Sequence, residues 1–347
     1  NFFVLSSLEK ENTYLLLLIM ENIKLSEKKI LVTGGAGFIG SNLCEELLKM
    51  NNEVVCLDNF LTGKKENISA FLKNKNFTLI EGDIRELSDC QRAIKGVDYV
   101  LNQAALGSVP RSIKTPLITN EININGFLNM LIAARDEGVK RFVYAASSST
   151  YGDSEVLPKV ESEIGNPLSP YAITKYVNEL YADVFSKIYK LDTIGLRYFN
   201  VFGKRQDPDG AYAAVIPKFV YQLINGESPI INGNGEYTRD FTYIDNVVQA
   251  NLLALEKVRT KTVNRVYNIA YGDSNSLNDL VKYLKKYLSK YDSSIEKIEV
   301  KYGPKRDGDI PNSFASIERA KQELNYNPRY SLQSGLKEAV KWYWENL

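Results

Sequence analysis

The chain of 347 residues contains no histidine and has few cysteines and tryptophans, three and two respectively. Histidine is the usual proton carrier near neutral pH and the commonest metal ligand. Its absence excludes Ser-His-Asp and Cys-His nucleophile systems and every histidine-ligated metal site. We therefore expect no metal centre. Proton transfer must rely on tyrosine, lysine, carboxyl groups or cysteine, and tyrosine is abundant, with 22 residues.

The chain also lacks an excess of charge and a long apolar run near its start. Lysine and arginine number 43 against 42 acidic residues, so no overall field favours nucleic acid or an anionic membrane as a partner. The apolar run from Leu15 to Met20 is far shorter than the roughly 20 residues that span a bilayer. With 44% hydrophobic and 24% charged residues, the composition is that of an ordinary globular protein.

Cys44, Cys56 and Cys90 are far apart and show no CxxC spacing. This pattern fits a reducing compartment rather than a disulfide framework, so we expect small core residues and a cytoplasmic protein. Residues 1–20 are interpreted as an N-terminal extension, with Met20 as a candidate start. They are left out of the fold argument.

From Lys29 onward, short runs rich in valine and isoleucine alternate with helix-length segments. Such alternation indicates βαβ units and a parallel sheet with helices on both faces. The sequence therefore predicts an α/β fold with a doubly wound, Rossmann-type parallel sheet. The expected strands are Ile30–Thr33, Glu53–Leu57, Phe77–Ile80, Tyr99–Asn102, Phe142–Ala146 and Thr193–Arg197, and the expected helices include Phe38–Met50 and Asn123–Glu137.

After Asn200 this rhythm gives way to sequence rich in glycine and proline. A further strand-like run, Arg265–Ile269, precedes two helical patterns at Leu277–Tyr287 and Leu332–Trp344. We expect a smaller C-terminal domain that caps the sheet. The predicted division is a dinucleotide-binding domain at 24–199, with added segments near 237–270, and a second domain at 200–236 and 271–347.

Gly34, Gly37 and Gly40 form a GxxGxxG pattern directly after the first strand, where the first helix begins. Such glycines permit a tight turn, a close approach of backbone to a pyrophosphate and close packing of helix on strand. The amino end of the helix offers amide donors to the anion. The pattern predicts a dinucleotide site.

Asp58 ends the second strand, where a carboxylate accepts hydrogen bonds from an adenosine ribose and repels a 2′-phosphate. This favours NAD over NADP. Asp83 follows the third strand, where an adenine amine could be met. Gln103 and Ala104 end the fourth strand beside the expected switch point of the sheet, which is where ligands bind in open α/β folds.

Tyr171 is followed four residues later by Lys175, and of the 22 tyrosines it alone has lysine at that spacing. On a helix the two side chains lie on one face. An ammonium there favours the phenolate, so we expect Lys175 to lower the pKa of Tyr171 and make it a usable base. Ser147, Ser148 and Ser149 lie upstream at the end of the fifth strand.

The motifs TGGAGFIG, AASSSTYGD, SPYAITKYVNE, LRYFNVFG and RDFTYIDNV, in this order, span the chain from about Lys28. Together they resemble the extended short-chain dehydrogenase/reductases that act on nucleotide sugars, and most closely the UDP-hexose 4-epimerases. The segments GSVPRS and GKRQDPDGAYAAVIPKF are similar to the bacterial UDP-N-acetylglucosamine 4-epimerase branch, which serves surface-polysaccharide synthesis.

The resemblance implies a transient oxidation of the sugar at C4 by tightly bound NAD. Tyr171 would take the 4-OH proton, and Lys175 would hold the nicotinamide ribose. Either Ser147 or Ser149 would act as the catalytic hydroxyl, and the sequence leaves this choice open. The cofactor site implied by the resemblance also includes Phe38, Ile39, Asn59, Ile84 and Asn123.

The resemblance implies a UDP-sugar as the partner molecule, with Ser313 as the residue that admits an acetamido group because it is small. A homodimer is implied too, formed by two helices of each subunit, those around Asn123–Glu137 and Tyr171–Tyr189. The other implied substrate residues are Gly107, Ser108, Ser147, Ser148, Ser149, Asn200, Val215, Lys218, Asn232, Arg239, Arg306 and Asp309.

Several alternatives remain open. A 4-epimerase of UDP-glucose or of UDP-hexuronic acids is the closest. A nucleotide-sugar 4,6-dehydratase needs an Asp-Glu pair where this chain has Ser148 and Ser149, and a decarboxylase similarly lacks its glutamate. A non-catalytic NAD-binding protein tends to lose the tyrosine or the lysine, whereas Tyr171 and Lys175 are both present.

Overall fold

The computed structural model describes residues 25–208, 214–256, 263–305 and 312–347. The N-terminal extension therefore lies outside the described residues. The centre of the fold is a seven-stranded parallel sheet with the order β11-β6-β5-β4-β1-β2-β3. Its strands are β1 (Lys29–Thr33), β2 (Glu53–Asp58), β3 (Phe77–Glu81), β4 (Tyr99–Asn102), β5 (Arg141–Ser147), β6 (Thr193–Tyr198) and β11 (Arg265–Ile269).

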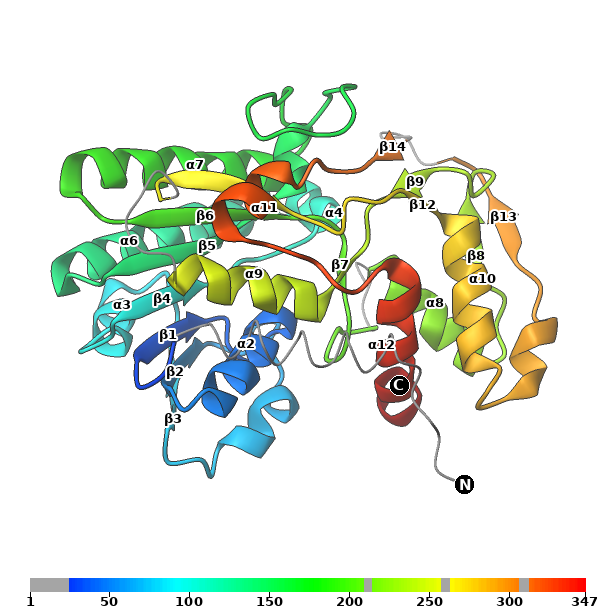
Figure 1. Ribbon diagram of the computed structural model, residues 1–347, viewed down its shortest axis with the longest axis horizontal. Coiled ribbons are helices and arrows are strands. Elements are labelled where there is room, and N and C mark those ends of the chain that lie inside the picture. The colour runs from blue at the N-terminus through cyan, green and yellow to red at the C-terminus, as the bar shows by residue number, and fades with distance from the viewer. Residues whose placement is uncertain (1–24, 209–213, 257–262, 306–311) are drawn as a thin grey trace.

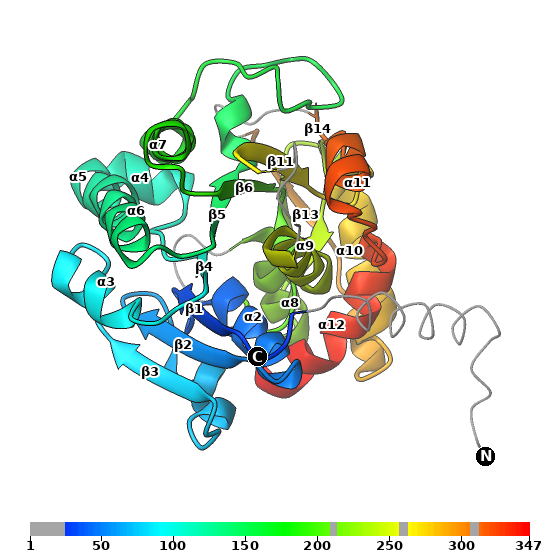
Figure 2. The ribbon, with the colours of Figure 1, turned by 60° about the vertical axis from the view of Figure 1, so that its left-hand side comes forward.

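Helices cover both faces of this sheet, as Figure 2 shows. Successive strand residues alternate between two apolar cores: Ile30 and Val32 pack with one, and Leu31 packs with the other. The first core includes α2 (Phe38–Lys49) and α9 (Ile244–Glu256). The second core includes α3 (Leu87–Ala93), α6 (Gly126–Glu137) and α7 (Pro170–Tyr189).

The doubly wound parallel fold predicted from the sequence is thus confirmed. Each predicted strand is present, with ends that differ by one residue or none. The strand at Arg265–Ile269 pairs with β6 at the edge of the sheet. The expected helix from Asn123 differs in detail, because residues Glu121–Asn125 form a π-helical turn that leads into α6.

The remaining helices gather mainly at one end of the molecule, to the right in Figure 1. There α8 (Val215–Ile224), α10 (Leu277–Leu288) and α12 (Leu332–Asn346) pack against one another. Helix α11 (Glu318–Leu324) instead lies against α9 and β11. The two-domain division stays a prediction. Short strands complete this region: β7 (Val201–Phe202), β8 (Ile230–Asn232), β9 (Thr238–Arg239), β10 (Thr242–Tyr243), β12 (Asn275–Ser276), β13 (Lys301–Gly303) and β14 (Asn312–Ser313).

Helix α7 begins at a well-defined cap. Ser169 accepts a hydrogen bond from the backbone N–H of Ala172 over 3.1 Å, and Pro170 occupies the first helical position. The short helices α4 (Val109–Lys114) and α5 (Pro116–Asn120) pack on α7. The Ser112 hydroxyl of α4 accepts a hydrogen bond from the backbone N–H of Tyr171 over 3.1 Å. The amino end of α7 is therefore fixed from both sides.

The three cysteines are free and buried, as expected for small core residues. In the part of the chain that the structure describes, no helix is long and apolar enough to cross a membrane.

Candidate active site

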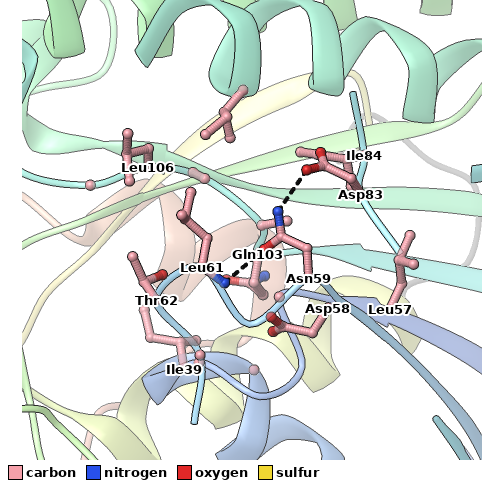
Figure 3. A pocket seen from close by; sticks show the side chains of 18 of the residues that line it. Ile39, Leu57, Asp58, Asn59, Leu61, Thr62, Asp83, Ile84, Gln103 and Leu106 are labelled. Atoms are coloured by element: carbon pink, nitrogen blue, oxygen red, sulfur yellow. Dashed lines mark hydrogen bonds between the residues drawn. The ribbon is translucent and has the colours of Figure 1, made fainter. Parts of the chain in front are cut away.

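A cavity of about 330 Å³ opens where β1, β2, β3 and β4 end (Figure 3). The glycine turn after β1 forms one wall, and the segments that follow the other strands form the rest. Most of the predicted cofactor residues meet here. Those that line the cavity are Gly34, Gly37, Phe38, Ile39, Gly40, Asp58, Asn59, Asp83, Ile84, Gln103 and Ala104.

The glycine turn has no room for side chains at two positions. Gly34 has φ +66°, and a Cβ there would lie 2.9 Å from the backbone of Ala104. A Cβ on Gly40 would lie 2.1 Å from the carbonyl oxygen of Gly34. Glycine therefore lets the turn, the β4 end and α2 approach one another closely. Because α2 begins at Phe38, its amino end faces the same cavity and presents amide donors to an anion.

Asp58 is held in place at the end of β2 by backbone donors. Its carboxylate accepts hydrogen bonds from the N–H of Ala36 over 2.9 Å and of Phe60 over 2.8 Å. Burial raises the pKa of Asp58, and these backbone donors oppose the rise. The carboxylate thus lies fixed in the cavity wall, where it could accept hydrogen bonds from the hydroxyl groups of a bound ligand.

Asp83 is oriented by two side chains. Asn59 donates to its carboxylate over 2.7 Å (Figure 3), and Arg85 donates over 2.7 Å through Nη2. Partial burial raises the pKa of this carboxyl, but the hydrogen bonds from Arg85 outweigh burial, so the pKa of Asp83 lies below its usual value. Asp83 is therefore ionised at neutral pH. The sequence did not single out Arg85.

Asn123 does not line the cavity, although it was expected among the cofactor residues. Its side chain instead accepts from the backbone N–H of Leu106 over 2.7 Å and donates to the Leu106 carbonyl and to the hydroxyl of Thr174, both over 3.1 Å. Asn123 thus fixes the segment after β4 to helix α7. The π-helical turn at Glu121–Asn125 is the local feature that carries it.

A second cavity, of about 260 Å³, contains Ser147, Tyr171 and Lys175. It shares Gln103 and Gly107 with the first cavity, so the two spaces adjoin. Its other lining residues are Ile39, Ala105, Ala145, Ala146, Tyr198, Asn200 and Val201.

Tyr171 and Lys175 lie one helical turn apart on α7, as predicted, with the ammonium 5.9 Å from the centre of the phenol ring. The Lys175 Nζ donates to the carbonyl of Ala145 on β5 over 2.7 Å. Burial lowers the pKa of Lys175 to about 8, and the carboxylate of Glu179 partly offsets this effect.

The expectation that the pKa of Tyr171 is lowered was wrong. Burial raises the pKa of Tyr171, and the hydroxyl of Ser147 only partly opposes the rise. The spacing in the sequence places the ammonium of Lys175 near Tyr171, but it does not show that the phenol is buried and has lost its contact with water. In this structure, therefore, the ammonium of Lys175 does not bring the pKa of Tyr171 below its usual value.

The three serines at the end of β5 differ in position. Ser147 lines the second cavity. The backbone N–H and the hydroxyl of Ser149 donate to the Ser147 hydroxyl over 3.2 and 2.9 Å, so Ser149 lies behind Ser147. Neither Ser148 nor Ser149 lines one of these cavities.

A third cavity, of about 600 Å³, adjoins the second and shares Asn200 and Val201 with it. Its wall contains the cations Lys218 and Arg239. Of the residues expected to bind substrate, Ser108, Asn200, Val215, Lys218, Asn232 and Arg239 line it.

Four other expected substrate residues, Ser313, Gly107, Arg306 and Asp309, are not among the described residues that line the third cavity. Ser313 lies on β14, and its carbonyl accepts from the backbone N–H of Asp240 over 2.9 Å. Gly107 lines the first two cavities rather than the third. Arg306 and Asp309 lie outside the described residues.

Comparison with known proteins agrees with this geometry. The NAD dependent epimerase/dehydratase family matches residues 30–270. The chain belongs to this family.

Its relatives include a putative UDP-glucose 4-epimerase of Methanocaldococcus jannaschii, which is 37% identical over 319 residues, 91% of this chain and 99% of that protein. Among solved structures, the UDP-N-acetylglucosamine 4-epimerase of Methanobrevibacter ruminantium M1, in complex with UDP-N-acetylmuramic acid, is 40% identical with a TM-score of 0.85. The alignment covers 93% of this chain and all of that one. The UDP-glucose 4-epimerase of Thermotoga maritima with UDP-glucose is 39% identical, with a TM-score of 0.83 and coverage of 91% and 98%.

In this epimerase-family chain, sequence reasoning missed several lining residues. Tyr198 lines the second cavity, and its hydroxyl donates to Gln103 over 3.1 Å. It belongs to the quoted motif LRYFNVFG, which was the available signal. Tyr237 and Phe241 in the third cavity flank Arg239 and could have been found in the same way.

Proposed function

We propose that this protein catalyses the reversible C4 epimerisation of UDP-N-acetylhexosamines, from UDP-GlcNAc to UDP-GalNAc, through a transient 4-keto sugar. The observation that carries the proposal is the position of the cavity around Ser147, Tyr171 and Lys175. It adjoins the glycine-turn cavity on one side and the cavity with Lys218 and Arg239 on the other. Membership of the NAD dependent epimerase/dehydratase family supports it.

The first cavity fits NAD. The absence of a Cβ at Gly34 and Gly40 lets the turn pack closely on the end of β4 and on α2, which shapes the place where a pyrophosphate would bind. Asp58 is fixed where a ribose diol could reach it. A 2′-phosphate would meet the Asp58 carboxylate and be repelled. The chemistry that NAD supplies when bound is reversible acceptance of a hydride.

The residues of the second cavity would handle the proton. Tyr171 takes the proton of the 4-OH and returns it after the 4-keto sugar has rotated to present its other face. The buried ammonium of Lys175 would hold the nicotinamide ribose. Ser147 donates a hydrogen bond to the 4-oxygen, and Ser149 holds Ser147 in that orientation.

The third cavity would hold the UDP group. Arg239 and Lys218 offer positive charge to the diphosphate, and a guanidinium adds paired hydrogen bonds. Asn200, which lines both the second and third cavities, lies where the sugar and the diphosphate would meet. We include Arg306 and Asp309 in the proposed site on the resemblance alone.

Two features favour a neutral acetylated sugar. Among the described residues of the second cavity, Lys175 is the one cation, and it already donates to Ala145, so the cavity offers no further positive charge to a hexuronate carboxylate. The resemblance places the small residue Ser313 beside the sugar, where it would leave room for an acetamido group. The main alternative substrate is UDP-glucose or UDP-galactose, which the same cavities would also accept.

Proton NMR tests the proposal. Purified protein is incubated separately with UDP-GlcNAc, UDP-glucose and UDP-GlcNAcA, without added reductant, and product formation is followed. We expect turnover of UDP-GlcNAc, with a Tyr171→Phe variant that binds the nucleotide sugar but forms no product. Equal turnover of all three would contradict the selectivity argument from Ser313. Product from UDP-glucose alone would show that the enzyme prefers the plain hexose over the acetylated one. No product from any of the three would refute the proposed activity.

We also infer a cytoplasmic homodimer that supplies surface-polysaccharide synthesis. Free cysteines fit a reducing compartment. An apolar face on α4, α5 and α7 supports the dimer. Its exposed side chains are Ile113, Leu117, Ile173, Leu180, Val184 and Ile188.

A further inference from the structure

Asp240 is a fully buried carboxylic acid in the region of the proposed UDP-sugar site, with 0% of its surface exposed. It follows Arg239 directly and precedes Phe241, and both of these residues line the third cavity. A carboxylate rarely has no contact with water unless its hydrogen bonds are satisfied within the protein. Its partners therefore indicate what it does.

The Asp240 carboxylate holds two separate segments through backbone donors. It accepts from the N–H groups of Tyr271 and Gly272, both over 3.1 Å at the nearest oxygen, in the loop between β11 and β12. It also accepts from the N–H of Ala315 over 3.2 Å, just after β14. Hydrogen bonds to a charged acceptor are stronger than neutral ones. One side chain thus ties the end of β9 to the loop between β11 and β12 and to the segment after β14.

The backbone of Asp240 adds two further links. Its N–H donates to the carbonyl of Ser313 over 2.9 Å, and its carbonyl accepts from the side-chain amide of Asn200 over 2.9 Å. Arg239, Asn200 and Ser313 all belong to the proposed substrate site. These three residues come from distant parts of the chain, and Asp240 connects to each of them.

We propose that Asp240 is a positioning residue for the UDP-sugar: its buried carboxylate holds β9, β14 and the loop between β11 and β12 in the arrangement that places Arg239 and Asn200 in the wall of the third cavity, with Ser313 paired to Arg239. The inference rests on the proposed function, because it takes a UDP-sugar as the ligand of this cavity. Asp240 itself need not touch the sugar.

A consequence of this arrangement is that substrate affinity depends on pH. Burial raises the pKa of Asp240 to about 7, although the three backbone donors oppose the rise. Two titratable groups face it. Asp273, on the loop between β11 and β12, raises this pKa further. Tyr326, after α11, is a neutral phenol whose own pKa is raised by burial and, to a lesser extent, by the Asp240 carboxylate. As pH falls through about 7, the carboxyl gains a proton, its hold on the backbone donors weakens and the affinity for substrate falls.

The absence of histidine makes this dependence diagnostic, because the side chain that ordinarily titrates near pH 7 is missing from the chain. Two other groups have pKa values close to 7, but they lie elsewhere in the fold. The pKa of Lys175 is about 8 in the second cavity, and the pKa of Asp245, near Lys204 at the start of α9, is about 6.

The test measures binding without turnover. The full chain with Tyr171→Phe is titrated with UDP-N-acetylglucosamine by calorimetry from about pH 5.5 to about pH 9. Its diphosphate is a diester and keeps one charge state over that range. We expect Kd to rise about tenfold as pH falls through about 7. An additional Asp240→Asn change should give a weaker Kd that no longer rises as pH falls through about 7, because Asn supplies no ionised acceptor.

The matched control is Asp292→Asn, which changes an exposed carboxylate elsewhere in the C-terminal region and should keep the pH-dependent Kd. If Asp240→Asn fails to fold, the profile of the Tyr171→Phe protein alone still decides, because a pH-independent Kd there overturns the inference. A pH dependence that survives Asp240→Asn overturns it equally. Either result leaves the proposed epimerase activity standing, since that activity is judged by NMR on the unaltered protein.

Discussion

The hydroxyl of Ser149 donates to the hydroxyl of Ser147 over 2.9 Å, and only Ser147 of the two lines the cavity with Tyr171 and Lys175. The sequence places both serines at the end of one strand and cannot rank them. In the structure the two serines have different positions. Ser147 lines the cavity and can contact a ligand, whereas Ser149 lies outside the cavity and donates to the Ser147 hydroxyl.

Ser147→Ala should therefore cost much more activity than Ser149→Ala. Loss of a hydrogen bond to the reacting oxygen typically lowers kcat about 100-fold, so we expect that scale for Ser147→Ala. Loss of the supporting hydroxyl of Ser149 should lower kcat less than about tenfold. Steady-state kinetics with UDP-GlcNAc would measure both, with Ser148→Ala as the control. Equal losses at Ser147 and Ser149 would contradict this division of roles.

Lys175→Met should abolish turnover and also stabilise the protein near neutral pH. The pKa of Lys175 is about 8 in the folded chain, below its unfolded value, so keeping it charged in the fold opposes stability. We expect a gain on the order of 1 kcal/mol in the free energy of unfolding at pH 7, after the lost hydrogen bond to Ala145 is counted.

The pH dependence of this gain follows from the same shift. Between the folded pKa of about 8 and the higher unfolded pKa, the unfolded chain binds more protons at Lys175 than the folded chain does. The stability of the unaltered protein therefore rises with pH in that range, and the advantage of Lys175→Met should shrink. Urea unfolding of both proteins at several pH values would check this. A constant difference across that range would contradict the shift.

Asp58 should make the protein selective for NAD over NADP. Its carboxylate is fixed by hydrogen bonds from the backbone N–H groups of Ala36 and Phe60, so it has little freedom to move away from a phosphate. We expect cofactor-free protein to bind NAD at least about 100-fold more tightly than NADP. Asp58→Asn should reduce that ratio, mainly by improving NADP binding. Fluorescence titration would measure it, and equal affinities in the unaltered protein would refute the assignment.

The main sheet and the dinucleotide site are predictable from the sequence because their signals are local. The apolar runs of β1 and β2 and the glycines at 34 and 40 define their own conformation within a few residues. Other features depend on contacts between distant segments. The raised pKa of Tyr171 comes from burial, and the support that Asp240 gives to β14 joins residues far apart in the chain. No local pattern encodes either.

The buried ion pair of Arg197 and Glu179 is another such contact, and it should be a large stability determinant. Arg197 on β6 donates twice to Glu179 on α7, over 2.8 and 2.7 Å, and both side chains are buried. Arg197→Met leaves the Glu179 charge buried without this partner, which typically costs about 3–5 kcal/mol. Adding Glu179→Leu to that variant should recover much of the loss. Denaturant unfolding would show both effects, and a loss below about 1 kcal/mol for Arg197→Met would contradict the role.

The apolar face on α4, α5 and α7 should mediate dimerisation, and a single charge placed there should break it. Leu180 on α7 has half of its surface exposed, and Leu117 on the neighbouring α5 is 80% exposed. Burying such side chains against a second copy is favourable, whereas a glutamate at the centre of the face would have to lose its water. We expect light scattering after size exclusion to give a dimer for the unaltered protein and a monomer for Leu180→Glu. Leu72→Glu changes a leucine that is 52% exposed outside this face and should remain dimeric. A dimer that survives Leu180→Glu would show that the subunits associate through another surface.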